Sequence, residues 1–277
     1  MGTAAEGTAG ASRAGAPRSL ESPTMVNYEV RGHVAVLTLD RPEARNAVND
    51  VVAQSMTEHL EAFEADPDVW VAVLAANGPV FCAGADLKLI NAGRAADTST
   101  AKGGFGGFTE FPRRKPVIGA VDGLATAGGC EIALACDMLV ASTNAAFGLA
   151  EVKRNLVAAA GGLYRLPKVI GKNVALEVAL TAEPLPVERA HQLGLVNRVT
   201  EPGKALEEAL ALAEQIAANA PLAVYASREL VIAADWDDED TIKAKTAKAF
   251  GDILESEDTK EGLTAFIEKR PPEWKGR

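Results

Sequence analysis

The sequence predicts an α/β protein in which strands and helices alternate up to about residue 200 and only helices follow. Apolar runs bounded by turn residues recur at 26–39, 69–75 and 117–121, with amphipathic segments between them. From residue 203 the apolar residues recur instead at helical spacing. This change of period divides the chain into a mixed part and a helical part.

Three segments follow from this pattern. Residues 1–24 are mostly Ala, Gly, Ser, Thr and Pro without an apolar run, so we expect a disordered tail. A transit peptide is the alternative because two arginines lie among Ala and Ser, although two acidic residues count against it. We expect the core with the active site at 25–200 and a helical oligomerisation region at 201–277, although packing of these helices within the chain is an equally open alternative.

Composition limits the classes of partner. The chain has 277 residues, 48% of them hydrophobic, and a net charge of −10, which argues against nucleic acid or an anionic membrane. No apolar run reaches the length of about 18 to 20 residues that spans a bilayer. An odd number of cysteines, Cys82, Cys130 and Cys136, indicates reduced thiols in a cytoplasmic protein. The three histidines lack ligand spacing, so no metal is expected.

The first elements are predicted by turn and cap residues. Segments 26–30 and 33–39 alternate apolar and smaller residues around Arg31-Gly32, which favours a hairpin. A helix should begin at Asn49 or Asp50, either of which can cap it. The continuous apolar run at 69–75 is typical of a strand that is covered on both faces.

The strand at 117–121 leads into Gly128-Gly129 and then a helical pattern that contains Glu131. Small residues before a helix leave the first N–H groups accessible, and these groups stabilise a developing anion. Burial among apolar residues would raise the pKa of Glu131 toward acid–base use. The alternative is a first-turn glutamate that only complements the helix dipole.

Two further segments carry candidate chemistry. Residues 80–88 read as a strand that ends in small residues, which leaves backbone donors at Gly84 and Ala85 accessible. Residues 91–109 are rich in Gly, Ala, Thr and Ser, and we expect a mobile flap near the ligand. Glu151, twenty residues after Glu131, is a second carboxylate in an apolar setting, although alone it would be an ordinary exposed acid.

The rest of the chain is predicted to be largely helical. A short strand at 138–141 follows the central helix, and a second strand is expected at 195–199. The predicted helices, with starts and stops at Gly and Pro residues, are 163–170, 172–180, 187–193, 203–219, 221–233, 239–255 and 259–270.

Four blocks in this order resemble the enoyl-CoA hydratase/isomerase (crotonase) family. They are Phe81-Cys82-Ala83-Gly84-Ala85-Asp86-Leu87-Lys88, Lys115-Pro116-Val117-Ile118, Gly128-Gly129-Cys130-Glu131 with Cys136-Asp137, and Phe147-Gly148 to Glu151. The resemblance covers residues 25 to 277. It implies a spiral of repeated ββα units and a C-terminal helical region that assembles trimers, often paired into hexamers.

The resemblance also assigns the site. It implies an oxyanion hole from the backbone N–H groups of Ala85 and Gly128, and catalytic roles for Glu131 and Glu151. Because both glutamates are present, it favours a hydratase that adds water across the 2,3 double bond of an enoyl-CoA in fatty-acid or related acyl-CoA breakdown. It implies that Glu131 is the base toward water and that Glu151 supplies the C2 proton.

The substrate is the implied small-molecule partner, and coenzyme A is part of it, so no separate cofactor is expected. The family pattern places the coenzyme along Ala83, Ala85, Asp86, Leu87 and Lys88, beside Gly128. Arg41, Arg45, Lys88 and the basic run 113–115 are candidates for its phosphates, although a solvated loop is the ordinary interpretation of such a run. Phe250 and Lys269 are candidates for contacts from a neighbouring subunit.

The sequence departs from the usual hydratase pattern at Ala150, at Ala125-Thr126-Ala127 and in the loop with Asn155 and Val157–Ala160. These positions line the acyl pocket or the water site, so they leave the substrate open. The alternatives are a double-bond isomerase, a carnitinyl-CoA-like dehydratase or other acyl-CoA lyase, and a non-catalytic acyl-CoA-binding protein.

Overall fold

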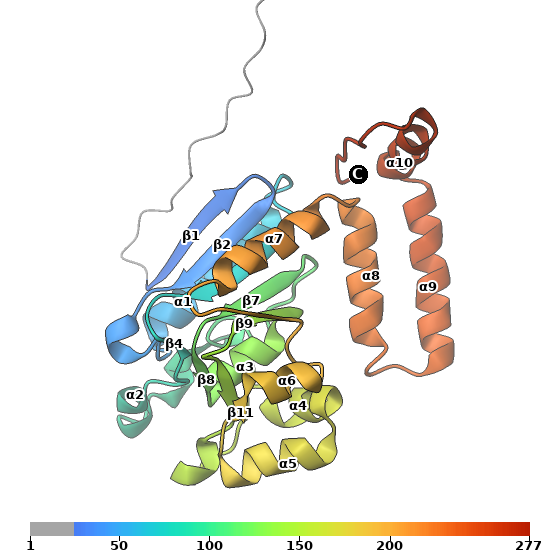
Figure 1. Ribbon diagram of the computed structural model, residues 1–277. Coiled ribbons are helices and arrows are strands. Elements are labelled where there is room, and N and C mark those ends of the chain that lie inside the picture. The colour runs from blue at the N-terminus through green and yellow to red at the C-terminus, as the bar shows by residue number, and fades with distance from the viewer. Residues whose placement is uncertain (1–24) are drawn as a thin grey trace, which may run out of the picture.

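The computed structural model of the protein describes residues 25–277, and the predicted tail at 1–24 lies outside them. Its larger sheet has six strands in the order β1-β2-β3-β7-β9-β12; β1 and β2 form an antiparallel hairpin, and the other neighbours are parallel (Figure 1). In that order the strands span Val26–Arg31, Val34–Leu39, Val71–Ala76, Val117–Val121, Met138–Ser142 and Arg198–Thr200. The predicted hairpin at the start of the chain is confirmed.

A smaller sheet has the order β11-β10-β8-β4. Its strands span Leu185–Pro186, Ala146–Gly148, Leu124–Thr126 and Val80–Cys82. The chain repeatedly gives one strand to the larger sheet, the next strand to the smaller sheet, and then a helix or helical turn: β3-β4-α2, β7-β8-α3 and β9-β10-η3. This arrangement is the expected spiral of ββα units, and the predicted fold class is confirmed.

The helices follow the predicted segments closely. Their bounds are α1 Asp50–Ala65, α2 Leu87–Asn91, α3 Gly128–Ala135, α4 Gly162–Ile170, α5 Lys172–Thr181, α6 Val187–Gln192, α7 Ala205–Ala217, α8 Pro221–Ala233, α9 Glu239–Leu254 and α10 Glu257–Glu268. Asn49 caps α1 by accepting a hydrogen bond from the Val52 N–H at 2.9 Å. No helix within the described residues is both long and apolar enough to cross a membrane.

The strand predicted at 195–199 is wrong in its first half. Leu195 and Val196 are buried, but their N–H groups bond to the carbonyl of Ala190 at the end of α6, so they form a tight turn. Strand β12 therefore begins only at Arg198. These two residues are apolar because they are buried in the turn, and their apolar character led to the prediction of a strand.

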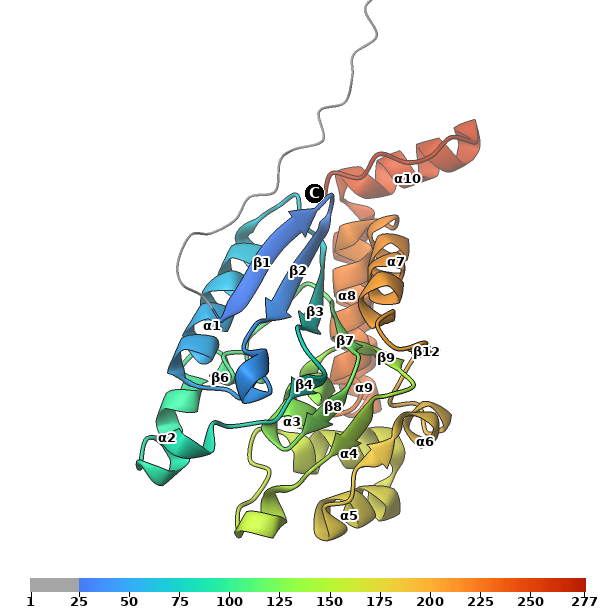
Figure 2. The same ribbon diagram turned by 60° about the vertical axis from the view of Figure 1, so that its left-hand side comes forward.

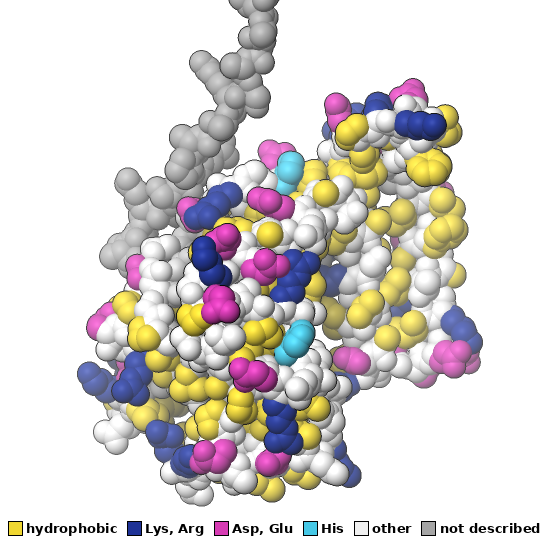
Figure 3. Space-filling model, in the orientation of Figure 1, with side chains coloured by type: hydrophobic (Ala, Val, Ile, Leu, Met, Phe, Trp, Pro, Cys, Tyr) yellow, Lys and Arg dark blue, Asp and Glu magenta, His cyan; other side chains and the backbone are white. Residues whose placement is uncertain are grey.

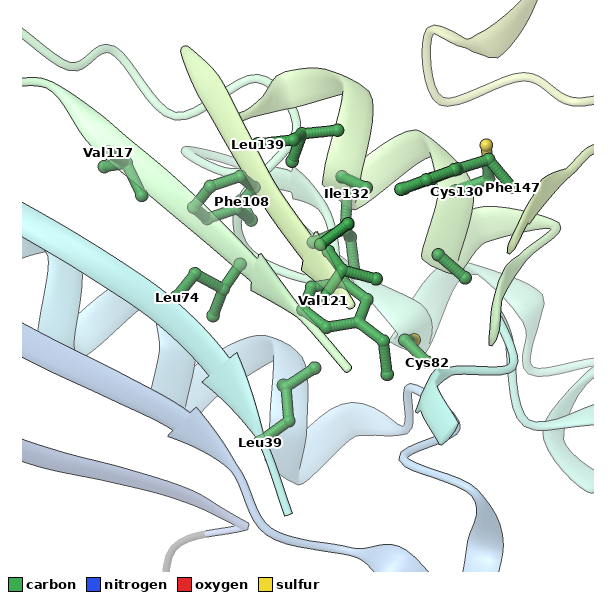
Figure 4. Packing of buried hydrophobic residues seen from close by; sticks show 14 of the residues in the cluster. Leu39, Leu74, Cys82, Phe108, Val117, Val121, Cys130, Ile132, Leu139 and Phe147 are labelled. Atoms are coloured by element: carbon green, nitrogen blue, oxygen red, sulfur yellow. The ribbon is translucent and has the colours of Figure 1, made fainter. Parts of the chain in front are cut away.

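The larger sheet is buried on both faces because its strands alternate their side chains between two apolar clusters. In β3, Leu74 packs with Leu37 and Phe63 on the α1 side, whereas Val73 packs with Ile118 on the α7 side. Figure 4 shows the α1-side cluster, which continues through Phe108 and Ile132 to the small sheet. The core therefore reaches from α1 to α3, which carries the central candidate residue.

The helices after residue 201 do not all have the same place. Helix α7 packs on β3, β7 and β9 and belongs to the core. Helices α8, α9 and α10 form an arm, visible in Figures 1 and 2, and α8 joins it to the core through the buried Tyr225 and the ion pair of Arg228 with Asp137. Helix α9 has no buried residue in this chain. The arm therefore presents apolar side chains to its surroundings, and these gather along it in Figure 3.

Candidate active site

Helix α3 begins at a junction where only small residues fit. A Cβ on Gly129 would come within 2.1 Å of the carbonyl oxygen of Cys82, and one on Gly128 within 2.4 Å of the Phe105 ring. Ala127, just before the helix, has a φ of 51°, which is unusual for a residue other than glycine. The backbone here is thus held tightly between β4 and the predicted flap.

The segment after β4 approaches the same helix start. A Cβ on Gly84 would lie 2.8 Å from the nitrogen of Gly128, so the two backbones are in direct contact. The N–H of Val48 donates to the carbonyl of Gly84, and the carbonyl of Val48 accepts from the N–H of Asp86, both at 2.8 Å. The N–H of Ala85 lies between these two bonds and takes part in neither. Among residues 25–277, no acceptor bonds to the N–H of Ala85 or Gly128. Two adjacent, unpaired main-chain donors are suited to bind one oxyanion.

Glu131 lies in the first turn of α3 and is only 3% exposed. Its Oε1 accepts hydrogen bonds from the N–H groups of Ala160 at 2.7 Å and Gly162 at 2.9 Å, the second of which opens α4. Burial raises the pKa of Glu131, while these two amides and the charge of Arg165 oppose the rise. Both bonds fall on one oxygen, so Oε2 remains for water or substrate.

Glu151 is the first residue of the 3₁₀ turn η3, Glu151–Arg154, which follows β10. Its Oε2 is buried and has no hydrogen-bond partner within the described part of the chain. Burial, with a contribution from the charge of Glu131, raises the pKa of Glu151 to about 7. A Cβ on Gly162 would lie 2.8 Å from Leu149 and 3.2 Å from the Cγ of Glu131. The charge of Glu131 acts on Glu151, and both charges act on the Cys130 thiol, so the structure brings the two predicted acids close together.

The predicted coenzyme segment lies beside these donors. Leu87 and Lys88 are exposed in α2, and Arg45 is exposed too. Arg45 lies beside this segment because its carbonyl accepts a hydrogen bond from the N–H of Ala83 at 3.0 Å. The Asp86 carboxylate is bound within the chain, because it caps α2 by accepting a hydrogen bond from the N–H of Lys88. This bond and the neighbouring Arg41 lower the pKa of Asp86. The Nη1 of Arg41 donates to Asp86 at 2.8 Å, so Arg41 is already paired.

The prediction that the run 113–115 contacts phosphates is wrong for two of its residues. Lys115 is 1% exposed, and its Nζ donates to the carbonyls of Phe63 and Asp66, where it satisfies the end of α1. Arg113 is buried against Asp137, with Nη1 to Oδ2 at 3.4 Å. Both cations are therefore bound within the chain: Lys115 donates to two carbonyls, and Arg113 pairs with Asp137 and donates to the carbonyl of Ala135.

Phe250 and Lys269 do not join the site within one chain. Phe250 lies on α9 and is 64% exposed, and Lys269 ends α10. Figures 1 and 2 place α9 and α10 away from α2. A contact between these residues and bound coenzyme would therefore require a second copy of the chain.

Sequence reasoning missed the residues that hold Glu131. Ala160 and Gly162 act through their N–H groups, and Arg165 acts on the same loop. Because every residue except proline has a main-chain N–H, the residue type does not reveal which N–H groups act as donors in a site. The available signal was Gly161-Gly162 at a helix start, where unpaired N–H groups attract a carboxylate.

Comparison with known proteins decides the family. A model of the enoyl-CoA hydratase/isomerase family matches residues 29–277. The chain belongs to this family. Among curated members, the carnitinyl-CoA dehydratase of Proteus mirabilis (strain HI4320) is 40% identical over 258 residues, which cover 91% of this chain and 98% of the relative. The carnitinyl-CoA dehydratase of Salmonella typhi is 40% identical over 252 residues, which cover 89% of this chain and 96% of the relative.

Solved structures of the family agree with the fold. The enoyl-CoA hydratase from Mycobacterium tuberculosis H37Rv superposes with a TM-score of 0.88 at 45% identity, covering 91% of this chain and 99% of that one. The carnitinyl-CoA hydratase from Mycobacterium avium gives a TM-score of 0.73 at 44% identity, covering 92% and 100%. The chain is therefore a crotonase-family acyl-CoA enzyme, and its relatives carry two different substrate names.

Proposed function

We propose that this crotonase-family protein is an enoyl-CoA hydratase. Glu131, as the carboxylate, takes a proton from water while the water oxygen bonds to C3 of the enoyl thioester. The electrons of the 2,3 double bond move to the thioester oxygen, which the N–H groups of Ala85 and Gly128 stabilise as an enolate. Glu151 then donates its proton to C2 and restores the thioester carbonyl.

One observation supports this proposal above all: the buried Glu131 and the half-buried Glu151, whose Oε2 is buried, lie near two adjacent, unpaired amides. The environments of the two acids differ in a way that fits the roles. Glu131 accepts two N–H bonds, which favour its charged form, whereas burial leaves Glu151 with a pKa of about 7. The two carboxyls titrate as a coupled pair.

Charge and exposure support the site for coenzyme A. Arg45 and Lys88 are exposed on either side of the segment that ends β4, and neither side chain forms an ion pair within residues 25–277. A net charge of −10 makes such local cations necessary for an anionic substrate. We assign the phosphates of the coenzyme to these two residues and no separate cofactor to the reaction.

A carnitinyl-CoA-type dehydratase is the second candidate, and the names of the 40% identical relatives favour it. The same two acids would then act in reverse and remove water from a 3-hydroxyacyl thioester. A double-bond isomerase would need a single acid to move a proton between two carbons. A non-catalytic protein would have no use for the paired glutamates.

We also propose that the arm of α8, α9 and α10 joins further copies of the chain into a trimer or hexamer. Phe266 is 84% exposed, Ile267 78% and Val231 72%, and with Phe250 they expose large apolar side chains on all three helices of the arm. A surface of this kind is typical of an interface in a symmetric oligomer.

The proposed function is tested with a panel of thioesters. Enoyl-CoA substrates of graded chain length, carnitinyl-CoA and a 3-enoyl-CoA are each incubated with the protein, and products are identified by mass and chromatography. Loss of ultraviolet absorbance from the conjugated thioester, with a 3-hydroxyacyl product, supports the hydratase. Reaction of carnitinyl-CoA alone, migration of the double bond alone, or binding without turnover would each replace it by the corresponding alternative.

A further inference from the structure

Arg165 of α4 connects the two loops that lie on either side of Glu131. Its Nη1 donates to the carbonyl of Ala160 at 3.0 Å, and its Nη2 donates to the carbonyl of Thr109 at 2.7 Å. Ala160 is also the residue whose N–H bonds to Glu131 at 2.7 Å. One guanidinium therefore ties Ala160, the residue whose N–H holds Glu131, to Thr109 at the end of the predicted flap.

The fit around this guanidinium is close. Gly161 has a φ of 117°, and a Cβ there would lie 1.9 Å from the Nη1 of Arg165. The guanidinium carbon also lies over the Tyr164 ring, 5.1 Å from the ring centroid. A planar fork with fixed donors can serve two carbonyls at once, which a lysine ammonium on a flexible stem does less well.

From this geometry we infer that Arg165 is a positioning residue for the proposed general base. It orients the loop 160–162 so that both N–H groups meet Glu131, and its positive charge favours the carboxylate. The inference rests on the proposed function for its kinetic consequence. Arg165 itself bonds to the loops and acts on the reaction only through Glu131.

Few charged groups compete with Arg165 around Glu131. Glu151 of η3 raises the local negative charge, and the Cys130 thiol lies beside both acids. Of the small-sheet strands packed on α3, β4 brings the buried Cys82, and β8 consists of Leu, Ala and Thr only. Removal of Arg165 should therefore raise the pKa of Glu131, because its charge now lowers it.

The test compares Arg165→Gln, Arg165→Lys and the control Arg189→Gln, whose side chain forms an exposed ion pair with Glu177. The kcat/KM for hydration is measured from pH 5 to 9. We expect Arg165→Gln to move the acid limb up by about half a pH unit or more. Arg165→Lys should keep the acid limb near its wild-type position but lower kcat, and Arg189→Gln should match the wild type.

An unchanged acid limb in Arg165→Gln would overturn the inference, as would an equal shift in Arg189→Gln. If the glutamine variant does not fold, Gly161→Ala serves in its place, since its Cβ would displace Nη1, with Gly171→Ala as the control at a positive φ without neighbours. A lower kcat in Gly161→Ala alone supports the inference, and equal effects in both contradict it.

A second measurement separates this inference from the proposed function. Carbon-13 NMR of the glutamate carboxyls follows the titration of Glu131 in the wild type and in Arg165→Lys and Arg165→Gln, without any substrate. A raised pKa of Glu131 in Arg165→Gln supports the inference even if the wild type turns over no thioester. An unchanged titration refutes it even if the wild type is an active hydratase.

Discussion

Gly84 lies directly against the main-chain nitrogen of Gly128. A Cβ added to Gly84 would lie only 2.8 Å from that nitrogen. These two glycines come from different turns of the spiral, one after β4 and one at the start of α3. Their contact places the N–H groups of Ala85 and Gly128 on neighbouring backbones. The contact therefore gives a direct way to test the proposed oxyanion hole.

Gly84→Ala should lower kcat for hydration by about 10² or more, because loss of one oxyanion donor typically costs that much. Gly194→Ala is the matched control, since both glycines have a φ of 86° but a Cβ on Gly194 would meet nothing within 4 Å. Both variants carry the same backbone strain. Equal kinetics in the two variants would show that the contact with Gly128 does not matter for turnover.

Replacing either acid should abolish most of the activity. Glu131→Gln and Glu151→Gln should each lower kcat/KM by about 10² to 10⁴, the usual contribution of a general acid or base. Glu177→Gln, which alters an exposed ion pair on α5, should change it little. The rates are measured with the best thioester of the panel. Unchanged turnover in both active-site variants would refute the proposed chemistry.

The activity should fall as pH rises past about 7, because Glu151 must be protonated to act as the acid and its pKa is about 7. The alkaline limb of kcat/KM measures this value. A rate that increased through pH 7 would instead make Glu151 the base and reverse the assigned roles.

The same residue should make stability depend on pH. The pKa of Glu151 is raised from 4.5 to about 7 on folding, so the folded state retains its proton longer than the unfolded state, and stability is lost as pH rises through this window. Between pH 5 and pH 8, the free energy of unfolding should fall by about 1 to 3 kcal/mol more in the wild type than in Glu151→Gln. Urea unfolding at the two pH values gives the difference. An equal change in the free energy of unfolding of the two proteins would contradict a raised pKa of Glu151 in the folded state.

The apolar arm should hold the assembly together. Phe266→Glu should shift the protein toward monomer in light scattering with size-exclusion chromatography, because it places a charge on a surface that would be buried between copies. Glu268→Gln, an exposed change two residues away, is the control. A wild type that is already monomeric at micromolar concentration would remove the proposed interface.

The elements that the sequence predicted well were long or marked by specific residues. The cap at Asn49 and the glycines that open α3 were visible in residue type, and so were the amphipathic helices. Strands β8 and β10 were missed because each has only three residues and, unlike β4, contains Ala, Thr or Gly beside a single large apolar residue. Within the site, the positions of Glu131 and Glu151 followed from sequence blocks.

What the sequence could not supply was the partner of each polar group. Lys115 appeared solvated in a basic run, yet tertiary structure buries it at the end of α1, because two orphan carbonyls there need a donor. The amides that hold Glu131 come from a loop about thirty residues later. Such pairings depend on where the spiral returns, which local pattern does not encode.

The helix α9, without any buried side chain of its own, has a further consequence. An isolated helix of this length is marginal in water, and within the chain α9 packs mainly along α8, so the proposed interface would supply much of the burial that stabilises it. Folding of the arm and encounter of the chains would then be one thermodynamic event. Dilution alone would lower the melting temperature, and the proportion of intact protein would follow the law of mass action.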